Sequence, residues 1–63
     1  MKMQVIHNYS GNDRDTVVLY DPLLREYHVH VMQGGTRMAW LCQIQTEEEA
    51  LATARDIAGV SAA

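Results

Sequence analysis

The sequence has little of what marks a secreted, membrane-bound or disulfide-stabilised domain. Cys42 is its only cysteine, so no disulfide can form within the chain, and this is the usual condition of proteins in a reducing compartment. No apolar run approaches the ~20 residues of a membrane span. The first six residues, Met1 to Ile6, lack the apolar stretch of a signal peptide. We therefore expect a cytoplasmic protein that does not enter a membrane.

Basic residues are also scarce. Five lysines and arginines stand against eight aspartates and glutamates, and the formal net charge is −3. A general nucleic-acid binder needs a basic stripe that displaces counterions, so nucleic acid is not an expected partner. The charge is compatible with a basic protein partner. Gly34-Gly35 joins two predicted strands and is therefore no phosphate loop, and no other catalytic, metal or nucleotide motif is present, so we expect neither an enzyme nor a cofactor.

The chain is short enough to predict one small domain over residues 1–63. A chain of about 60 residues buries only about 60% of its unfolded surface, and its stability is therefore marginal. Domains of this size often gain stability from a metal or a partner subunit.

Residues 46–59 carry the clearest secondary-structure signal, which is that of a helix. Thr46 is a good N-cap, and Glu49 completes a capping box by reaching back to the Thr46 amide. Gly59 ends the helix because glycine tolerates the left-handed conformation. The apolar stripe between the caps is mostly alanine, so we expect Leu51 and Ile57 to anchor it and Leu51→Ala to cost about 2–5 kcal/mol.

Four segments before the helix have the alternation of β-strands, and they are residues 3–9, 16–20, 27–31 and 37–44. Gly34-Gly35 predicts a two-residue type I′ hairpin turn between the last two. Asp21-Pro22 predicts a turn between the second and third.

Together these elements predict a small α+β domain with ββββα order. It has a four-stranded, mainly antiparallel sheet and one C-terminal helix packed on one face. Strict alternation places Met38, Trp40, Cys42 and Ile44 on one face of the fourth strand. We expect the helix to cover the face that carries Trp40 and Val29, with Trp40 in the core and Cys42 as a small buried side chain. The other face then keeps apolar residues that suit a protein interface or a homodimer.

His28 and His30 are the one chemically suggestive pair. Alternate residues of a strand point the same way, so the two imidazoles share a face and, with His7 or Cys42, are a candidate metal site. The plainer alternative is a pair of histidines on the solvent face of a half-buried strand. Cys42 is a nucleophile only if a histidine lies beside it.

The segment from Trp40 to Ala58, with Thr-Glu-Glu-Glu-Ala-Leu and then Ala-Arg-Asp-Ile-Ala, resembles the strand-to-helix ending of several small β-β-β-α proteins. HicB-type antitoxins are one such group. The sequence lacks the Pro-Asp-x-Pro-Gly turn expected of that family, so the resemblance implies shared architecture.

These observations favour a non-enzymatic protein-binding module, an inhibitor or adaptor that occludes a larger partner. By size and charge it is similar to small phage or mobile-element inhibitors, including those of CRISPR complexes. The alternatives are a self-associating, antitoxin-like or regulatory domain and a metal- or small-ligand-binding domain that uses His28 and His30. The residues expected to be exposed and to contact the partner are Asp13, Arg14, Asp15, His28, His30, Glu47 and Glu48.

Overall fold

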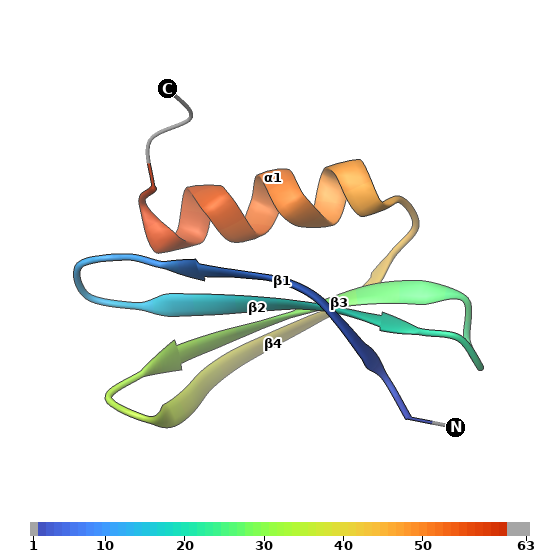
Figure 1. Ribbon diagram of the computed structural model, residues 1–63, viewed down its shortest axis with the longest axis horizontal. Coiled ribbons are helices and arrows are strands. Elements are labelled where there is room, and N and C mark those ends of the chain that lie inside the picture. The colour runs from blue at the N-terminus through green and yellow to red at the C-terminus, as the bar shows by residue number, and fades with distance from the viewer. Residues whose placement is uncertain (1, 61–63) are drawn as a thin grey trace.

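Four strands and then a helix follow one another in residues 2–60, the part of the chain that this computed structural model describes (Figure 1). The elements are β1 (Gln4–Ser10), β2 (Asp15–Asp21), β3 (Glu26–Gln33), β4 (Thr36–Ile44) and α1 (Glu47–Ala58). The strands pair antiparallel in the order β1-β2-β3-β4, and α1 lies on one face of the sheet. The predicted α+β class, element order and topology are therefore confirmed.

The turns follow from the residues that the sequence places there. Gly34 and Gly35 have φ angles of 59° and 81°, which are the positive values that a type I′ turn requires. Asp21 fixes the turn between β2 and β3, because its Oδ1 accepts hydrogen bonds from the amides of Leu23 at 2.9 Å and Leu24 at 3.2 Å. Short turns of this kind make each strand pair with its neighbour in sequence.

Both ends of α1 are capped as predicted. The Thr46 hydroxyl accepts a hydrogen bond from the Glu49 amide at 3.2 Å. The reciprocal bond of a capping box, from the Thr46 amide to the Glu49 carboxylate, is not formed between these two described residues. Gly59 has a left-handed φ of 77°, and the amides of Gly59 and Val60 both donate to the Arg55 carbonyl, at 3.0 and 3.2 Å. This C-terminal arrangement is a Schellman motif.

The core is built from small side chains. Ala50 and Ala54 of α1 are fully buried against the valines Val18 and Val29 of the sheet, which are fully buried too. Because alanine is short, the helix backbone can lie close to the sheet, and the Thr16 hydroxyl donates a buried hydrogen bond of 2.9 Å to the Ala54 carbonyl. We call the row Ala50, Ala54 and Ala58 the alanine stripe.

The alanine stripe, and not Leu51 or Ile57, makes the buried contact of the helix. The side chains of Leu51 and Ile57 are only partly buried, and they lie beside the alanine stripe. The expectation that these two residues anchor the helix is therefore wrong. The expected cost of Leu51→Ala falls below the range for a fully buried leucine, since less apolar area is lost.

The faces of β4 differ from the prediction, because two irregularities interrupt its pairing with β3. Tyr27 pairs with Ile44, but Val29 pairs with Leu41, so β4 contains an extra residue between these pairs. Gln43, within this segment, has a positive φ of 63°. A bulge of one residue reverses the side on which all following side chains lie.

As a result, Trp40 is not a core residue. It pairs with His30 on the face away from α1, and 49% of its surface is exposed. Cys42 is exposed as well, which contradicts its expected burial. The helix covers the face that carries Val29, Leu41 and Ile44 instead.

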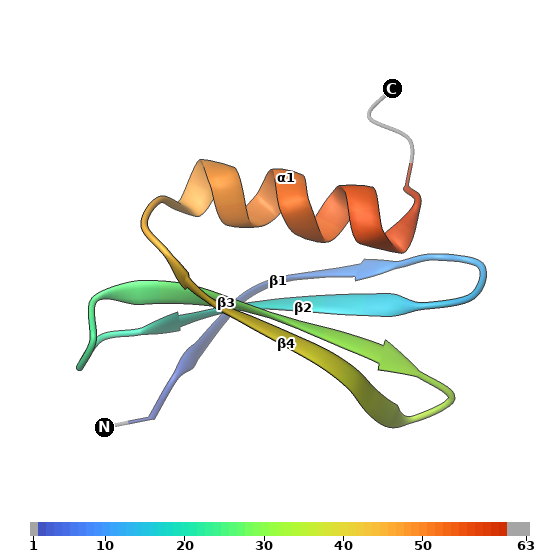
Figure 2. The same ribbon diagram turned by 180° about the vertical axis from the view of Figure 1, so that it is seen from behind.

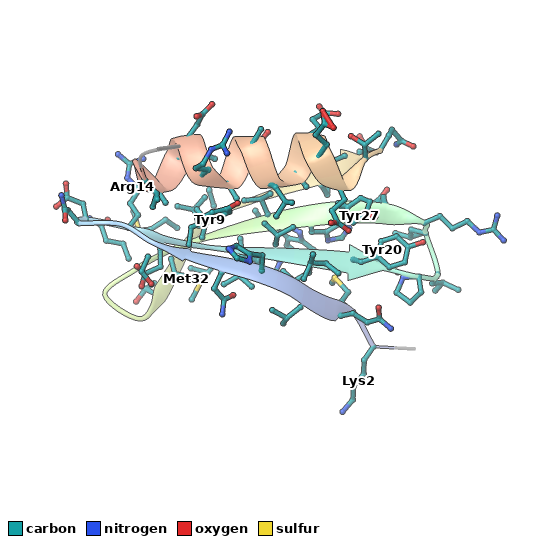
Figure 3. The ribbon with its side chains drawn as sticks, turned by 45° about the horizontal axis from the view of Figure 1, so that its top comes forward. Lys2, Tyr9, Arg14, Tyr20, Tyr27 and Met32 are labelled. Atoms are coloured by element: carbon teal, nitrogen blue, oxygen red, sulfur yellow. The ribbon has the colours of Figure 1, made fainter. Side chains whose placement is uncertain are left out.

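The helix does not cover the whole sheet. Figures 1 and 2 show that the Gly34–Gly35 end of the β3–β4 hairpin diverges from α1, in keeping with the twist between neighbouring strands. Figure 3 shows Tyr9, Tyr20 and Tyr27 on the helix side of the sheet and Met32 on the opposite side, which we call the outer face.

The close packing of the alanine stripe predicts that Ala54→Leu destabilises the fold by about 1–3 kcal/mol, because a larger side chain must push α1 away from Val18 and Val29. Urea unfolding followed by circular dichroism measures this change. Ala52→Leu is the matched control, since Ala52 lies outside the core cluster. Equal stability of the two variants would contradict the proposed packing.

Candidate partner-binding site

A groove of about 570 Å³ lies beside the C-terminal end of α1, on the helix side of the sheet. Its floor is largely apolar and its rim is charged. The lining residues are Asp13, Arg14, Val31, Gln33, Met38, Ala39, Leu41 and Ile57. The volume lies within the range of about 300–1,000 Å³ that is typical of ligand sites.

The β1–β2 loop brings Asp13 and Arg14 to this groove. The Gly11 amide donates to the Arg14 carbonyl at 2.9 Å, which closes the loop. A Cβ atom on Gly11 would collide with the Ala58 carbonyl oxygen, so only glycine allows the loop to approach the end of α1 this closely. Figure 3 shows Arg14 beside that end of the helix.

A smaller hollow of about 310 Å³ continues the groove around the C-terminus of α1. Asp13, Arg14 and Ile57 line both hollows, and Asp56 adds a second carboxylate on this side. The site therefore combines an apolar floor with two carboxylates and one guanidinium at its edge. Such a site suits a segment that carries both apolar and basic side chains.

The predicted contact residues do not form one surface. Asp13 and Arg14 are exposed at the groove, whereas Glu47 and Glu48 are exposed in the first turn of α1, at the other end of the helix. Asp15 is exposed at the start of β2, opposite Met32 of β3. The apolar part of the groove was missed from the sequence, because strict alternation in β4 predicts no bulge.

His28 is buried, not exposed as predicted, with only 3% of its surface accessible. Its Nδ1 accepts a hydrogen bond from Nε1 of Trp40 at 3.0 Å, so its proton lies on Nε2 and is donated to Oε2 of Glu26 at 2.7 Å. The Trp40 indole covers the imidazole on the outer face, with ring centroids 5.6 Å apart. We call these three hydrogen-bonded side chains the Glu26–His28–Trp40 network.

His30 is half-buried and lies against the edge of Trp40, with ring centroids 5.2 Å apart. Its Nε2 is buried and has no hydrogen-bond partner among the described residues. Burial lowers the pKa of His30 below its ordinary value of 6.5, and the positive charge of Arg37 and the proximity of His28 lower it further. His30 is therefore neutral at pH 7.

The geometry does not suit the metal-binding alternative. Both ring nitrogens of His28 are already engaged. His7 pairs with Val18 and makes an edge-to-face contact with Tyr9 on the helix side, so it does not share the outer face with His30. Within residues 2–60, no group of three or more histidine, cysteine or acidic side chains is placed to hold a metal ion.

Comparisons with known proteins do not extend this description. The chain matches no family model, no curated protein and no solved structure. In the described part of the chain, no helix has both the length and the apolar character that a membrane crossing requires.

The lowered pKa of His30 predicts a stability that depends on pH. The unfolded chain binds a proton near pH 6.5, while folded His30 stays neutral to lower pH, so the unfolded state takes up more protons in that interval. The free energy of unfolding should therefore decrease as the pH falls below about 6.5. Urea titrations at pH 7.5 and 5.5 measure it. The His30→Gln substitution should make this decrease in the free energy of unfolding smaller. The exposed control His7→Gln should show the same decrease as the wild type. A decrease of wild-type size in His30→Gln would refute the link between His30 and the pH dependence.

The contact of Gly11 with α1 predicts that Gly11→Ala lowers the free energy of unfolding by about 1–3 kcal/mol, or more if the loop cannot shift. The added Cβ collides with backbone oxygens of both Ala58 and Arg14. Asn12→Ala is the control, because Asn12 is exposed in the same loop. Thermal unfolding of the three proteins compares them, and wild-type stability of Gly11→Ala would show that the loop does not pack on the helix as described.

Proposed function

We propose that the domain is a non-enzymatic protein-binding module whose groove between α1 and the β3–β4 hairpin takes up an apolar, basic segment of a larger protein. The observation that carries the proposal is the groove itself. An open apolar floor formed by Ala39, Leu41 and Met38 lies next to the carboxylates of Asp13 and Asp56. Met38 is 60% exposed, so its apolar side chain is accessible to a partner beside the groove floor.

The charge of the site supports a basic partner. The whole domain carries a net charge of −3. Two carboxylates and one guanidinium at the groove leave a local excess of negative charge. Charge of one sign around an apolar groove steers a partner of the opposite sign and fixes its orientation, while the apolar floor contributes the burial.

The open groove supports an inhibitor or adaptor role. A domain that holds a segment of its partner in this groove covers that segment against other contacts. The edge strands, β1 and β4, give less support to the alternative of self-association. Register shifts interrupt both β1 and β4, and such bulges disfavour the pairing of edge strands between molecules.

A site-specific photocrosslinker tests the proposal in the source cell. A benzophenone amino acid at Ala39, on the groove floor, should give a defined crosslinked protein that the same group at Ala52 does not. The purified partner should then bind Ala39→Arg at least about tenfold more weakly than wild type, which corresponds to about 1.4 kcal/mol. Ala52→Arg carries the same charge change and should bind normally.

Two results would overturn the proposal. One is the absence of any product at Ala39, or the same products at both positions. The other is unchanged affinity of the purified partner for Ala39→Arg. The double variant Asp13→Asn with Asp56→Asn measures the contribution of charge to partner binding. It should lower the association rate and make that rate less dependent on salt.

A further inference from the structure

Trp40 is half-exposed on the outer face, and its indole is held there by one hydrogen bond. The exposed fraction of Trp40 is 49%, and its Nε1–H donates to Nδ1 of His28 at 3.0 Å. Two further groups touch the indole without a hydrogen bond. The His30 ring lies at its edge, with ring centroids 5.2 Å apart, and the Arg37 guanidinium carbon lies 4.8 Å from its centroid. Of these contacts, only the bond to His28 fixes the direction of the indole N–H.

The bond between Trp40 and His28 exists only while His28 is neutral. An indole N–H can donate but not accept, so Nδ1 of His28 must offer its lone pair. The single proton of the neutral ring is on Nε2 and is donated to Oε2 of Glu26 at 2.7 Å. A second proton can therefore add only at Nδ1, where it takes the lone pair that the indole uses. Two N–H groups would then face each other, and the hydrogen bond is lost.

Burial couples the uptake of this proton to a movement of Trp40. Only 3% of the His28 surface is accessible, and the Trp40 indole covers its ring with centroids 5.6 Å apart. Because Nδ1 faces the indole nitrogen, water reaches Nδ1 only after the indole has moved. Proton uptake by His28 and displacement of the indole are therefore one event.

The charges of the outer face suit a protonated His28. The titratable and charged groups on this side are Glu26 and His30 on β3, Asp15 and Asp21 on β2, and Arg37 and Cys42 on β4. In line with His28 on β2 and β1 are Leu19 and Val5, which carry no charge. Three carboxylates thus stand against one guanidinium, and Glu26 would form an ion pair with the imidazolium through the bond it already makes.

We propose that His28 is a pH-sensitive switch that controls the position of Trp40. While His28 is neutral, the indole is held against the outer face. When Nδ1 takes up a proton, the imidazolium keeps its bond to Glu26, and the indole leaves Nδ1 and turns toward solvent. The switch alters the outer face and not the groove on the helix side, so it goes beyond the function proposed above.

Trp40 supplies its own signal for the test, because it is the only tryptophan of the chain. The purified protein is titrated from about pH 8 to about pH 5, the interval in which histidine side chains ordinarily change charge. The ¹⁵N chemical shifts of the His28 ring report its protonation, and acrylamide quenching of the emission reports the accessibility of the indole. The quenching constant should rise, and the indole N–H resonance should shift, with the midpoint of the His28 ring signals. The far-UV circular dichroism should stay that of the folded protein.

Three variants assign the change to His28. His28→Gln places an amide oxygen that can accept from Trp40 and does not titrate, so the pH dependence of quenching should be lost. Glu26→Gln keeps His28 and removes the carboxylate charge, so the midpoint should move to lower pH, and this variant serves the test even if His28→Gln does not fold. His30→Gln is the matched control, because it removes the other imidazole beside Trp40 without touching the hydrogen bond. Its quenching should still rise in acid.

Any of four results would rule out the switch. The first is a quenching constant that stays the same while His28 gains its proton. The second is a rise in quenching that persists in His28→Gln or disappears in His30→Gln. The third is a midpoint that Glu26→Gln leaves unchanged. The fourth is a rise that coincides with loss of the far-UV signal, because unfolding would then be what exposes Trp40.

Discussion

The packing of the alanine stripe on Val18 and Val29 is the contact on which the rest of the structure depends. It brings one helix close to the sheet, and the close approach allows Thr16 to reach the Ala54 carbonyl and Gly11 to touch the end of α1. A helix is straight and a sheet is twisted, so one helix cannot follow four strands at this distance. The part that it leaves uncovered is the Gly34–Gly35 end of the β3–β4 hairpin (Figure 1), and the groove lies there.

Much of the fold is visible in the sequence, because its signals are local. Thr46 and Gly59 delimit the helix, and Gly34-Gly35 sets a turn whose geometry only a few residue types accept. Alternation identifies all four strands. These signals depend on the conformation of neighbouring residues, and the structure confirms them to within about two residues at each end, the usual uncertainty of element boundaries.

The sites depend on information that is not local. Gln43, in the bulge of β4, has a positive φ angle. A glutamine in the sequence does not predict this conformation. That one extra residue places Trp40 on the outer face, where its indole N–H donates a hydrogen bond to His28. Asp13 and Arg14 were predicted as contact residues from their place in a polar loop, but their position beside Ala39 follows from the packing of Gly11 on α1. Only the strand pairing and the packing of the folded chain bring these residues together.

The simple order of the strands has a consequence for how the chain reaches this structure. Every strand pairs with the next one along the sequence, so each pairing closes only a short loop. The entropy lost in closing a loop grows with its length, and topologies made of short loops fold quickly. The long-range step is the packing of α1 on β2 and β3. The hairpin at Gly34–Gly35 can form before this step, and α1 then completes the core.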